Sequence, residues 1–247
     1  MSVQGKSALI IGGASGLGAA TLRVFTSAGA RCIVADRDKS GLERLASEIV
    51  GVETLCGDAT DPEFSGAISG REVDIMVHTA GIDPLSATDV PGTSLQDWQT
   101  VIGVNLTSAF LFARSVLPGM IARRSGCLLF TGSIAGIKPT PREAAYAVSK
   151  AGVIQLARAI ALDHAKHGIR ANALCPGMLE SIMADRRSSM TESDRTSRHR
   201  AANAMVPVGR EGTYAEVARL ALVLCDEELS SYVTGQAVVA DGGFLLA

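Results

Sequence analysis

The sequence has few aromatic residues, no paired cysteine motif and almost no net charge. Only 4% of its 247 residues are aromatic while 47% are hydrophobic, so we expect a sizeable core built mainly from aliphatic side chains. The five cysteines are odd in number and form no CxxC pair, which argues against a zinc or redox site and favours reduced, buried thiols. A formal net charge of -2 gives no general attraction to nucleic acid or to an anionic membrane.

A long hydrophobic run is also absent near the N-terminus. The apolar stretch before Gly12 is too short to span a bilayer, and it ends at glycines rather than at a signal-peptide cleavage pattern. We therefore expect a cytoplasmic protein whose partner is a small molecule rather than nucleic acid or a membrane. No linker, repeat or low-complexity segment divides the chain, which predicts one domain over residues 1–247.

Short apolar runs alternate with longer helical patterns along the chain. This alternation predicts an α/β fold with a single Rossmann-type, doubly wound parallel sheet and helices on both faces. The predicted strands are 7–11, 31–35, 75–78, 127–131, 170–175 and 237–240. The predicted helices are 17–27, 40–49, 95–123, 145–167 and 214–225.

One segment, from Ser181 to about Gly212, does not follow this alternation. It is polar, rich in Arg, Ser and Thr, and poorly periodic. A long irregular insertion in a compact α/β domain is usually a functional loop, so we expect a substrate lid over about 181–212. Its arginines could attract an acidic substrate, although a solvated lid is the interpretation we favour.

The turn after the first predicted strand is rich in glycine. Glycine permits positive φ and lets a diphosphate approach the backbone, while the free N–H groups of a following helix face the anion. The spacing is Gly-x-x-x-Gly-x-Gly rather than GxGxxG, so an ordinary strand-to-helix turn stays open as an alternative. The turn reads Gly12-Gly13-Ala14-Ser15-Gly16-Leu17-Gly18.

Asp36 strengthens the interpretation of this turn as a dinucleotide site. It ends the second predicted strand, about 20 residues past the glycines, where an acidic side chain can accept hydrogen bonds from the adenosine ribose. Its charge would repel a 2′-phosphate, which predicts NAD rather than NADP, and Arg37 and Lys39 are close enough to weaken that exclusion. The alternative is an ordinary solvated acid at a strand end.

Tyr146 and Lys150 lie one helical turn apart in the stretch AAYAVSK. A phenol with a reference pKa of about 10 is a poor base at neutral pH, and a nearby ammonium lowers that pKa. Ser133 follows the strand 127–131, at the edge where ligands bind in open parallel sheets. Taken alone, the pair of Tyr146 and Lys150 is explained equally well as a surface contact.

These motifs together resemble the short-chain dehydrogenase/reductase family. The resemblance covers nearly the whole chain and implies an enzyme that interconverts a secondary alcohol (simple, cyclic or polyol) and a ketone by hydride transfer, usually as a homotetramer. No metal is expected. The residues that carry the resemblance are Gly12, Gly16, Gly18, Asn105, Ser133, Tyr146, Lys150, Pro176-Gly177 and the run from Val239 to Gly243.

The resemblance also implies a role for each matching position. Tyr146 would exchange a proton with the substrate oxygen, Lys150 would lower its pKa and bind the nicotinamide ribose, and Ser133 would orient the substrate oxygen. Asn105 would hold a water that links Lys150 to solvent. Asp58 would lie beside the adenine. The full set of expected cofactor-binding residues is Gly12, Ser15, Gly16, Leu17, Gly18, Asp36, Arg37, Asp58, Ala59, Ala80, Gly81, Tyr146, Lys150, Pro176, Gly177 and Ser181.

Three positions depart from the family pattern. Ile11 stands where threonine is usual, so we expect a turn hydrogen bond to be missing. His78-Thr79 replaces Asn-Asn, which leaves open what braces the sheet there, and we interpret His78 as a packed, hydrogen-bonded histidine. Ser181 replaces a threonine and keeps the hydroxyl. None of these changes removes a reacting group.

Two other functions stay open from the sequence. A 3-oxoacyl-(acyl-carrier) reductase shares these motifs but more often prefers NADPH, which Asp36 disfavours. Arg123 and Arg124 keep this alternative open, because carrier proteins are acidic. A protein that binds NAD without turnover is the second alternative, and it would not need the intact set of reacting side chains.

Overall fold

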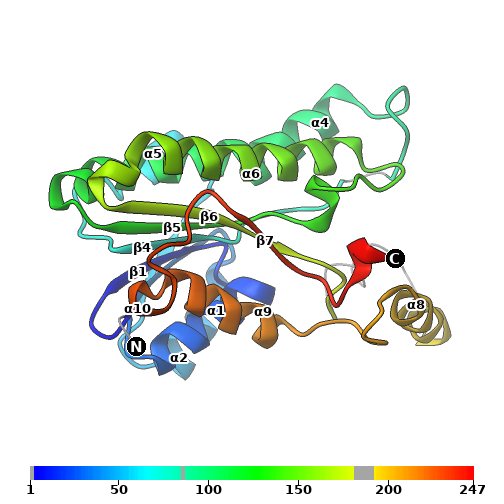
Figure 1. The fold of residues 1–247 in the computed structure, drawn as a ribbon, viewed down its shortest axis with the longest axis horizontal. Helices are drawn as coiled ribbons and strands as arrows, with labels where there is room; N and C mark the ends of the chain where they lie inside the picture. Colours follow the sequence, from blue (N-terminus) through cyan, green and yellow to red (C-terminus); the bar gives the residue numbers. More distant parts are fainter. Residues whose placement is uncertain (1–2, 85–86, 181–191) are drawn as a thin grey trace.

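The computed structural model describes residues 3–84, 87–180 and 192–247, and for 192–198 it describes the backbone only. The described residues form a parallel, seven-stranded sheet in the order β3-β2-β1-β4-β5-β6-β7 (Figure 1). The order in which strands are added to the sheet therefore reverses between β1 and β4, and open α/β sheets bind ligands at the carboxyl edge of such a point. The strands are β1 (Ser7–Ile11), β2 (Arg31–Asp36), β3 (Glu53–Cys56), β4 (Ile75–His78), β5 (Gly126–Thr131), β6 (Ile169–Pro176) and β7 (Ala237–Ala240).

Helices cover both faces of this sheet (Figure 1). Side chains of neighbouring strand residues point to opposite faces, so Ile10 joins one apolar core with Leu22, while Leu9 joins the other with Phe112. This two-sided burial explains why the strands are continuous apolar runs. One layer holds α1 (Gly16–Ser27), α2 (Lys39–Glu48) and α9 (Tyr214–Cys225), and the other holds α4 (Leu95–Ile102), α5 (Ser108–Arg123) and α6 (Ala144–His164).

The predicted helix 95–123 is helical throughout but is not one regular helix. Between α4 and α5 lies a π-helical turn, Gly103–Thr107, which contains Asn105. Such π turns are rare and often occur at functional sites. By length and composition alone Leu95–Arg123 could cross a membrane, yet it packs along the sheet with Phe112 and Met120 fully buried, as the core helix of a globular domain does.

Several elements of the fold were not predicted from the sequence, among them β3, α8 (Glu192–Met205) and two short helices. Strand β3 was not predicted, because it is an edge strand whose residues are half-buried or exposed and so lack an apolar run. The segment 181–212 was expected to be irregular; this was wrong for residues 192–205, which form α8, whereas residues 206–212 belong to no helix or strand. That helix is strongly polar, and the buried Ala202 and the following Val206 give its apolar signal only at the end. The remaining helices are the short α3 (Pro62–Gly66) and α10 (Glu227–Ser230).

Candidate active site

The glycine turn after β1 is packed tightly against the backbone of the chain that follows β4. Gly12 has a φ of +78°, and a Cβ atom there would lie 2.4 Å from the backbone nitrogen of Ala80. A Cβ on Gly18 would lie 2.1 Å from the carbonyl oxygen of Gly12. Both distances are far below van der Waals contact, so a side chain at either position would deform the turn.

The start of α1 is left open to an anion. Among the described helices, α2, α4 and α9 begin with a side-chain cap from Asp38, Ser94 and Thr213. The corresponding Ser15 makes no side-chain cap hydrogen bond to α1. Uncapped N–H groups and the positive end of the helix dipole stabilise a phosphate at this place. The residues of the turn therefore fit the diphosphate of a dinucleotide.

Thr79 braces this turn from the neighbouring strand. Its Oγ1 lies 2.7 Å from the carbonyl oxygen of Ile11 and 3.1 Å from that of Gly12, so its one hydrogen is donated to Ile11 or shared between the two. We expected the turn to lack a hydrogen bond because Ile11 replaces a threonine. Ile11 has no hydroxyl with which to bond the turn, as expected, and Thr79, directly after β4, supplies one from the neighbouring strand. The same hydroxyl links the end of β4 to the end of β1, so Thr79 is the side chain that braces the sheet there.

The carboxylate of Asp36 is fixed in orientation at the end of β2. One oxygen accepts a hydrogen bond from the Ala14 N–H at 2.9 Å, and the other accepts one from the Asp38 N–H at 2.9 Å. The side chain is therefore held against the glycine turn, in the place where the adenosine ribose was predicted to bind. Arg37 is exposed beside it.

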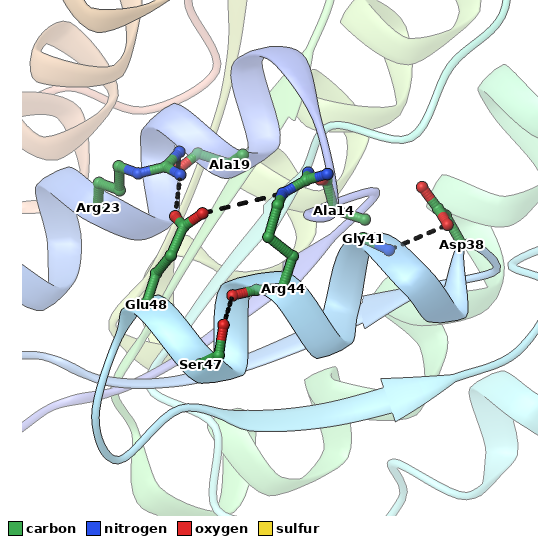
Figure 2. Close-up of polar contacts among 8 residues, drawn as sticks. All are labelled: Ala14, Ala19, Arg23, Asp38, Gly41, Arg44, Ser47 and Glu48. Carbon is green, nitrogen blue, oxygen red and sulfur yellow. Dashed lines mark hydrogen bonds and ion pairs between the residues drawn. The ribbon is translucent and has the colours of Figure 1, made fainter.

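Arg44 binds the carbonyl oxygen of Ala14, the residue whose N–H bonds Asp36. Figure 2 shows this α2 residue reaching the turn, where its Nη2 donates to the Ala14 carbonyl at 3.2 Å. Glu48 lies between Arg44 and Arg23 of α1, at 3.9 Å and 2.5 Å from their nitrogens. These ion pairs are largely exposed, so their main effect is to orient Arg44 rather than to stabilise the fold.

Asp58 follows β3 at the same edge of the sheet. The N–H and the hydroxyl of Thr60 both donate to it at 2.8 Å, and together with the charge of Arg37 they hold the pKa of the Asp58 carboxyl below its usual range. The carboxylate therefore stays ionised at neutral pH. Ala59, next in the chain, packs against the core.

Lys150 is a buried cation beside Tyr146. Its side chain extends from α6 to donate to the carbonyl oxygen of Thr131, at 2.8 Å from Nζ, and Nζ lies 5.6 Å from the centre of the Tyr146 ring. Burial lowers the pKa of Lys150 to about 8, against the opposing charge of Asp83. At neutral pH the amine thus remains mainly an ammonium, although one that loses its proton far more easily than an exposed lysine.

Asn105 ties the loop after β4 to α6. From the π turn, its Oδ1 accepts from the Ile82 N–H at 2.7 Å, and its Nδ2 donates to the Ile82 carbonyl at 2.9 Å and to Ser149 Oγ at 3.0 Å. Ser149 in turn donates to the Tyr146 carbonyl at 2.7 Å. The hydrogen bonds of the Asn105 side chain therefore position α6 relative to the loop after β4. Its proposed role in holding a water stays a prediction.

Ser133 begins a short 3-10 turn that rests on α6. Its Oγ accepts from the Ala135 N–H at 3.1 Å, and the turn Ile134–Gly136 follows. A Cβ on Gly136 would lie 2.7 Å from the carbonyl carbon of Lys150, so only glycine lets the two backbones approach this closely. This contact sets the height of Ser133 relative to Tyr146, one turn earlier on α6.

His78 is a buried, neutral brace, as we interpreted it from the sequence. Its Nε2 lies 2.8 Å from Ser108 Oγ, and that hydroxyl already donates to the Val104 carbonyl at 2.6 Å. Because a hydroxyl has one hydrogen, Nε2 must be the donor in the contact with Ser108. Burial, with a smaller contribution from the charge of Lys150, lowers the pKa of His78 to about 3.

Comparison with known proteins decides the family. A family model described as enoyl-(acyl carrier protein) reductase matches residues 12–245. The 3-oxoacyl-[acyl-carrier-protein] reductase FabG of Thermotoga maritima is 35% identical over 258 residues, with 100% of both chains covered. The crystal structure of an oxidoreductase of the short-chain dehydrogenase/reductase family from Burkholderia thailandensis superposes with a TM-score of 0.88 at 29% identity, covering 99% of this chain and 94% of that one. The chain belongs to the short-chain dehydrogenase/reductase family.

The relatives of this short-chain dehydrogenase/reductase differ in their substrates. Besides the 3-oxoacyl-[acyl-carrier-protein] reductase, galactitol 2-dehydrogenase (L-tagatose-forming) of Cereibacter sphaeroides is 34% identical over 251 residues, covering 98% of this chain and 96% of the relative. The family membership makes the protein an oxidoreductase that uses a nicotinamide cofactor. It does not distinguish NAD from NADP or select a substrate.

The remaining predicted positions also lie at the carboxyl edge of the sheet. Ala80 and Gly81 follow β4, and a Cβ on Gly81 would lie 3.3 Å from Lys150 Nζ. Pro176 ends β6, and the Gly177 N–H donates to the Ala240 carbonyl at 3.0 Å. Ser181 lies outside the described residues. The described part of the chain contains no group of three or more His, Cys, Asp or Glu residues that could hold a metal ion.

Sequence reasoning missed the residues that position this site. Thr79 was noted only as a departure from the family pattern, and Ser149 and Gly136 were given no role. The Ser-x-x-Gly spacing from Ser133 to Gly136 is a local signal for a turn that could have drawn attention to this glycine. No local signal reveals Thr79, whose partner Ile11 is 68 residues away in the chain.

Proposed function

We propose that the protein is an NAD-preferring dehydrogenase that interconverts a secondary alcohol, whether simple, cyclic or polyol, and a ketone. The observation that carries this proposal is the buried ammonium of Lys150, held by the Thr131 carbonyl beside the Tyr146 ring. Burying a cation costs free energy, so a buried lysine often marks a functional site. Here the charge lies beside a tyrosine that needs a nearby positive charge to act as a base.

The side chains support an acid/base cycle in which Tyr146 is the catalytic residue. In the oxidation of an alcohol, its phenolate oxygen accepts the hydroxyl proton, and in ketone reduction the phenol returns it. The charge on Lys150 stabilises the negative oxygen of Tyr146. Ser133 hydrogen-bonds the substrate oxygen and orients it. The bound nicotinamide would supply the hydride acceptor or donor.

Asp36 supports NAD as the preferred cofactor. Its carboxylate is fixed by two backbone N–H groups, so it can accept hydrogen bonds from the ribose hydroxyls without reorienting. A 2′-phosphate placed there would meet a negative charge that cannot turn away, which costs affinity. A comparison of kcat/KM for NAD and NADP tests this part, and a higher value with NADP would refute it.

The decisive experiment is a Tyr146→Phe variant assayed on a panel of secondary alcohols. NADH absorbance reports turnover, and we expect the wild-type protein to oxidise at least one alcohol. Removing the phenolic oxygen should lower kcat about 1,000-fold, in the range of general acid–base catalysis. Unchanged circular dichroism and nucleotide affinity would show that the variant is folded. Equal activity of the variant would contradict the proposal.

A second candidate is a reductase of carrier-linked 3-oxoacyl thioesters. The similarity to the Thermotoga maritima reductase favours it, and so do the exposed Arg123 and Arg124 at the end of α5, which suit an acidic carrier. Oxidation of NADPH with an acetoacetyl thioester, at a rate above that with the ketone corresponding to any alcohol in the panel, would support this candidate.

Exposed apolar side chains support a homotetramer, which we propose together with a cytoplasmic location. Leu95, Phe110 and Val148 are exposed by 69%, 48% and 47%, and they lie on α4, α5 and α6. Leu246 near the C-terminus is 92% exposed. Apolar residues on these helices would be covered by a second copy of the chain. Sedimentation analysis tests the assembly.

A further inference from the structure

Helices α1 and α9 pack side by side on one face of the sheet (Figure 1). Val217 and Ala221 of α9 belong to the same buried apolar cluster as Leu22 and Phe25 of α1. Tyr214, the first residue of α9, precedes Val217 by three residues and Ala221 by seven, so it lies on the same face of its helix. The face of α9 that packs on α1 therefore begins with an aromatic ring.

Hydrogen bonds fix the start of α9 at the carboxyl edge of the sheet. The Gly212 N–H donates to the Met178 carbonyl at 3.0 Å, which holds the chain before α9 against the segment that follows β6. Thr213 and Glu216 form a capping box, in which the side chain of each residue accepts the N–H of the other. The first turn of α9 is thus capped by its own chain, whereas α1 has no side-chain cap from Ser15.

The side chain of Tyr214 borders the glycine turn. Gly16 is the first residue of α1, and a Cβ atom placed on it would lie 3.5 Å from both Cζ and the hydroxyl oxygen of Tyr214. That is ordinary van der Waals distance, so the ring end lies beside the turn without overlapping it. At Gly12 and Gly18 the nearest described atoms are backbone, but at Gly16 they belong to this half-buried ring.

We propose that Tyr214 is a further cofactor-binding residue, whose ring forms the outer wall of the diphosphate site at the start of α1. This rests on the cofactor site of the proposed function. A diphosphate bound to the N–H groups of α1 would have the ring of Tyr214 beside it. A ring that excludes water lowers the local dielectric, which strengthens the attraction between the anion and the helix end. The hydroxyl is not needed for this shielding, because a phenyl ring of the same size provides it.

The test measures nucleotide binding by Tyr214→Ala and Tyr214→Phe without turnover. Fluorescence titration gives the Kd for NADH, and calorimetry gives the Kd values for ADP-ribose, which contains the diphosphate, and for adenosine, which does not. In the alanine variant we expect NADH and ADP-ribose to bind about ten-fold more weakly, and adenosine within about two-fold of wild type. The phenylalanine variant keeps the ring, so all three ligands should bind within about two-fold of wild type.

Tyr232→Ala is the matched control, because it removes the same side chain from a fully exposed position. It should change none of the three Kd values. Adenosine binding and circular dichroism show whether each variant is folded.

Three results would overturn the proposal. They are an alanine variant that binds ADP-ribose as tightly as wild type, an equal loss of adenosine and ADP-ribose binding, and a phenylalanine variant as weak as the alanine variant. Because binding is measured without turnover, a wild-type protein that binds NADH but converts no alcohol or ketone would overturn the proposed function alone.

Discussion

The glycine turn and the surroundings of Lys150 are the two ends of the candidate site, and they are built in different ways. At the glycine turn, the backbone fills the space, and a Cβ on Gly12 or Gly18 would overlap neighbouring backbone atoms. At α6, buried side chains do the work: Lys150 reaches the Thr131 carbonyl, and Asn105 pairs with the backbone of Ile82. Both places lie at the carboxyl edge of one sheet, a few strands apart.

This difference predicts how each end fails. We proposed that the turn binds an anion through backbone N–H groups, which do not depend on a particular side chain, so we expect it to be damaged by adding atoms. The reacting end depends on charged and polar atoms taken out of water, so it is damaged by removing atoms or by changing their charge. Tyr146→Phe removes an atom at the proposed reacting end. Three further substitutions test whether the two ends respond differently to added and to removed atoms.

Gly18→Ala should produce the largest effect at the turn. The added methyl group would lie 2.1 Å from the Gly12 carbonyl oxygen and 2.6 Å from Thr79 Oγ1, and backbone cannot yield as a flexible side chain does. We expect a loss of about 3 kcal/mol in the free energy of unfolding from this overpacking, together with weaker NADH binding. Urea denaturation and fluorescence titration measure the two losses.

Gly66→Ala is the matched control for that change. Gly66 ends α3, and a Cβ there meets nothing within 4 Å. Alanine has a higher helix propensity than glycine, so this variant should be as stable as the wild type or slightly more so. If Gly18→Ala were equally harmless, the close approach at the turn would not be a constraint on the sequence.

His78→Asn should change the pH dependence of stability rather than activity. The folded pKa of about 3 lies below the reference value of 6.5, so between these values the unfolded chain binds one more proton. The stabilising effect of a neutral His78 is therefore present above pH 6.5 and is lost as the pH falls toward 3. The slope from this group approaches about 1.4 kcal/mol per pH unit.

The asparagine variant lacks this titration. Urea denaturation between pH 4 and pH 7 should therefore show a shallower fall in the free energy of unfolding for His78→Asn than for wild type. Carboxylates contribute equally to both proteins, so the difference in slope isolates His78. Parallel curves would mean that the histidine is accessible to protons in the folded state.

Local patterns in the sequence predicted the strands and helices with a regular apolar pattern. They missed contacts between residues that are far apart in the chain. Strands 7–11, 75–78 and 237–240 and the helix 214–225 have the predicted bounds. For 7–11 and 75–78 the reason is that every residue is buried, which requires a continuous apolar run in the sequence. Strand β3 and α8 were missed because their burial is partial. The polar surroundings of Glu211 suggested a solvated loop, and only the fold shows that its carboxylate is nearly buried.

Asp36→Asn should have the smallest effect. It concerns a side chain proposed to contact the cofactor near the glycine turn, where backbone atoms form most of the site. Losing the charge removes the repulsion of a 2′-phosphate, so we expect the NAD/NADP ratio of kcat/KM to fall about ten-fold, equivalent to about 1.4 kcal/mol. Asp38→Asn is the control, because Asp38 caps α2 through the Gly41 N–H at 3.0 Å. It should leave the ratio unchanged. If both variants left the ratio unchanged, the preference for a cofactor would reside in the backbone of the turn rather than in the carboxylate.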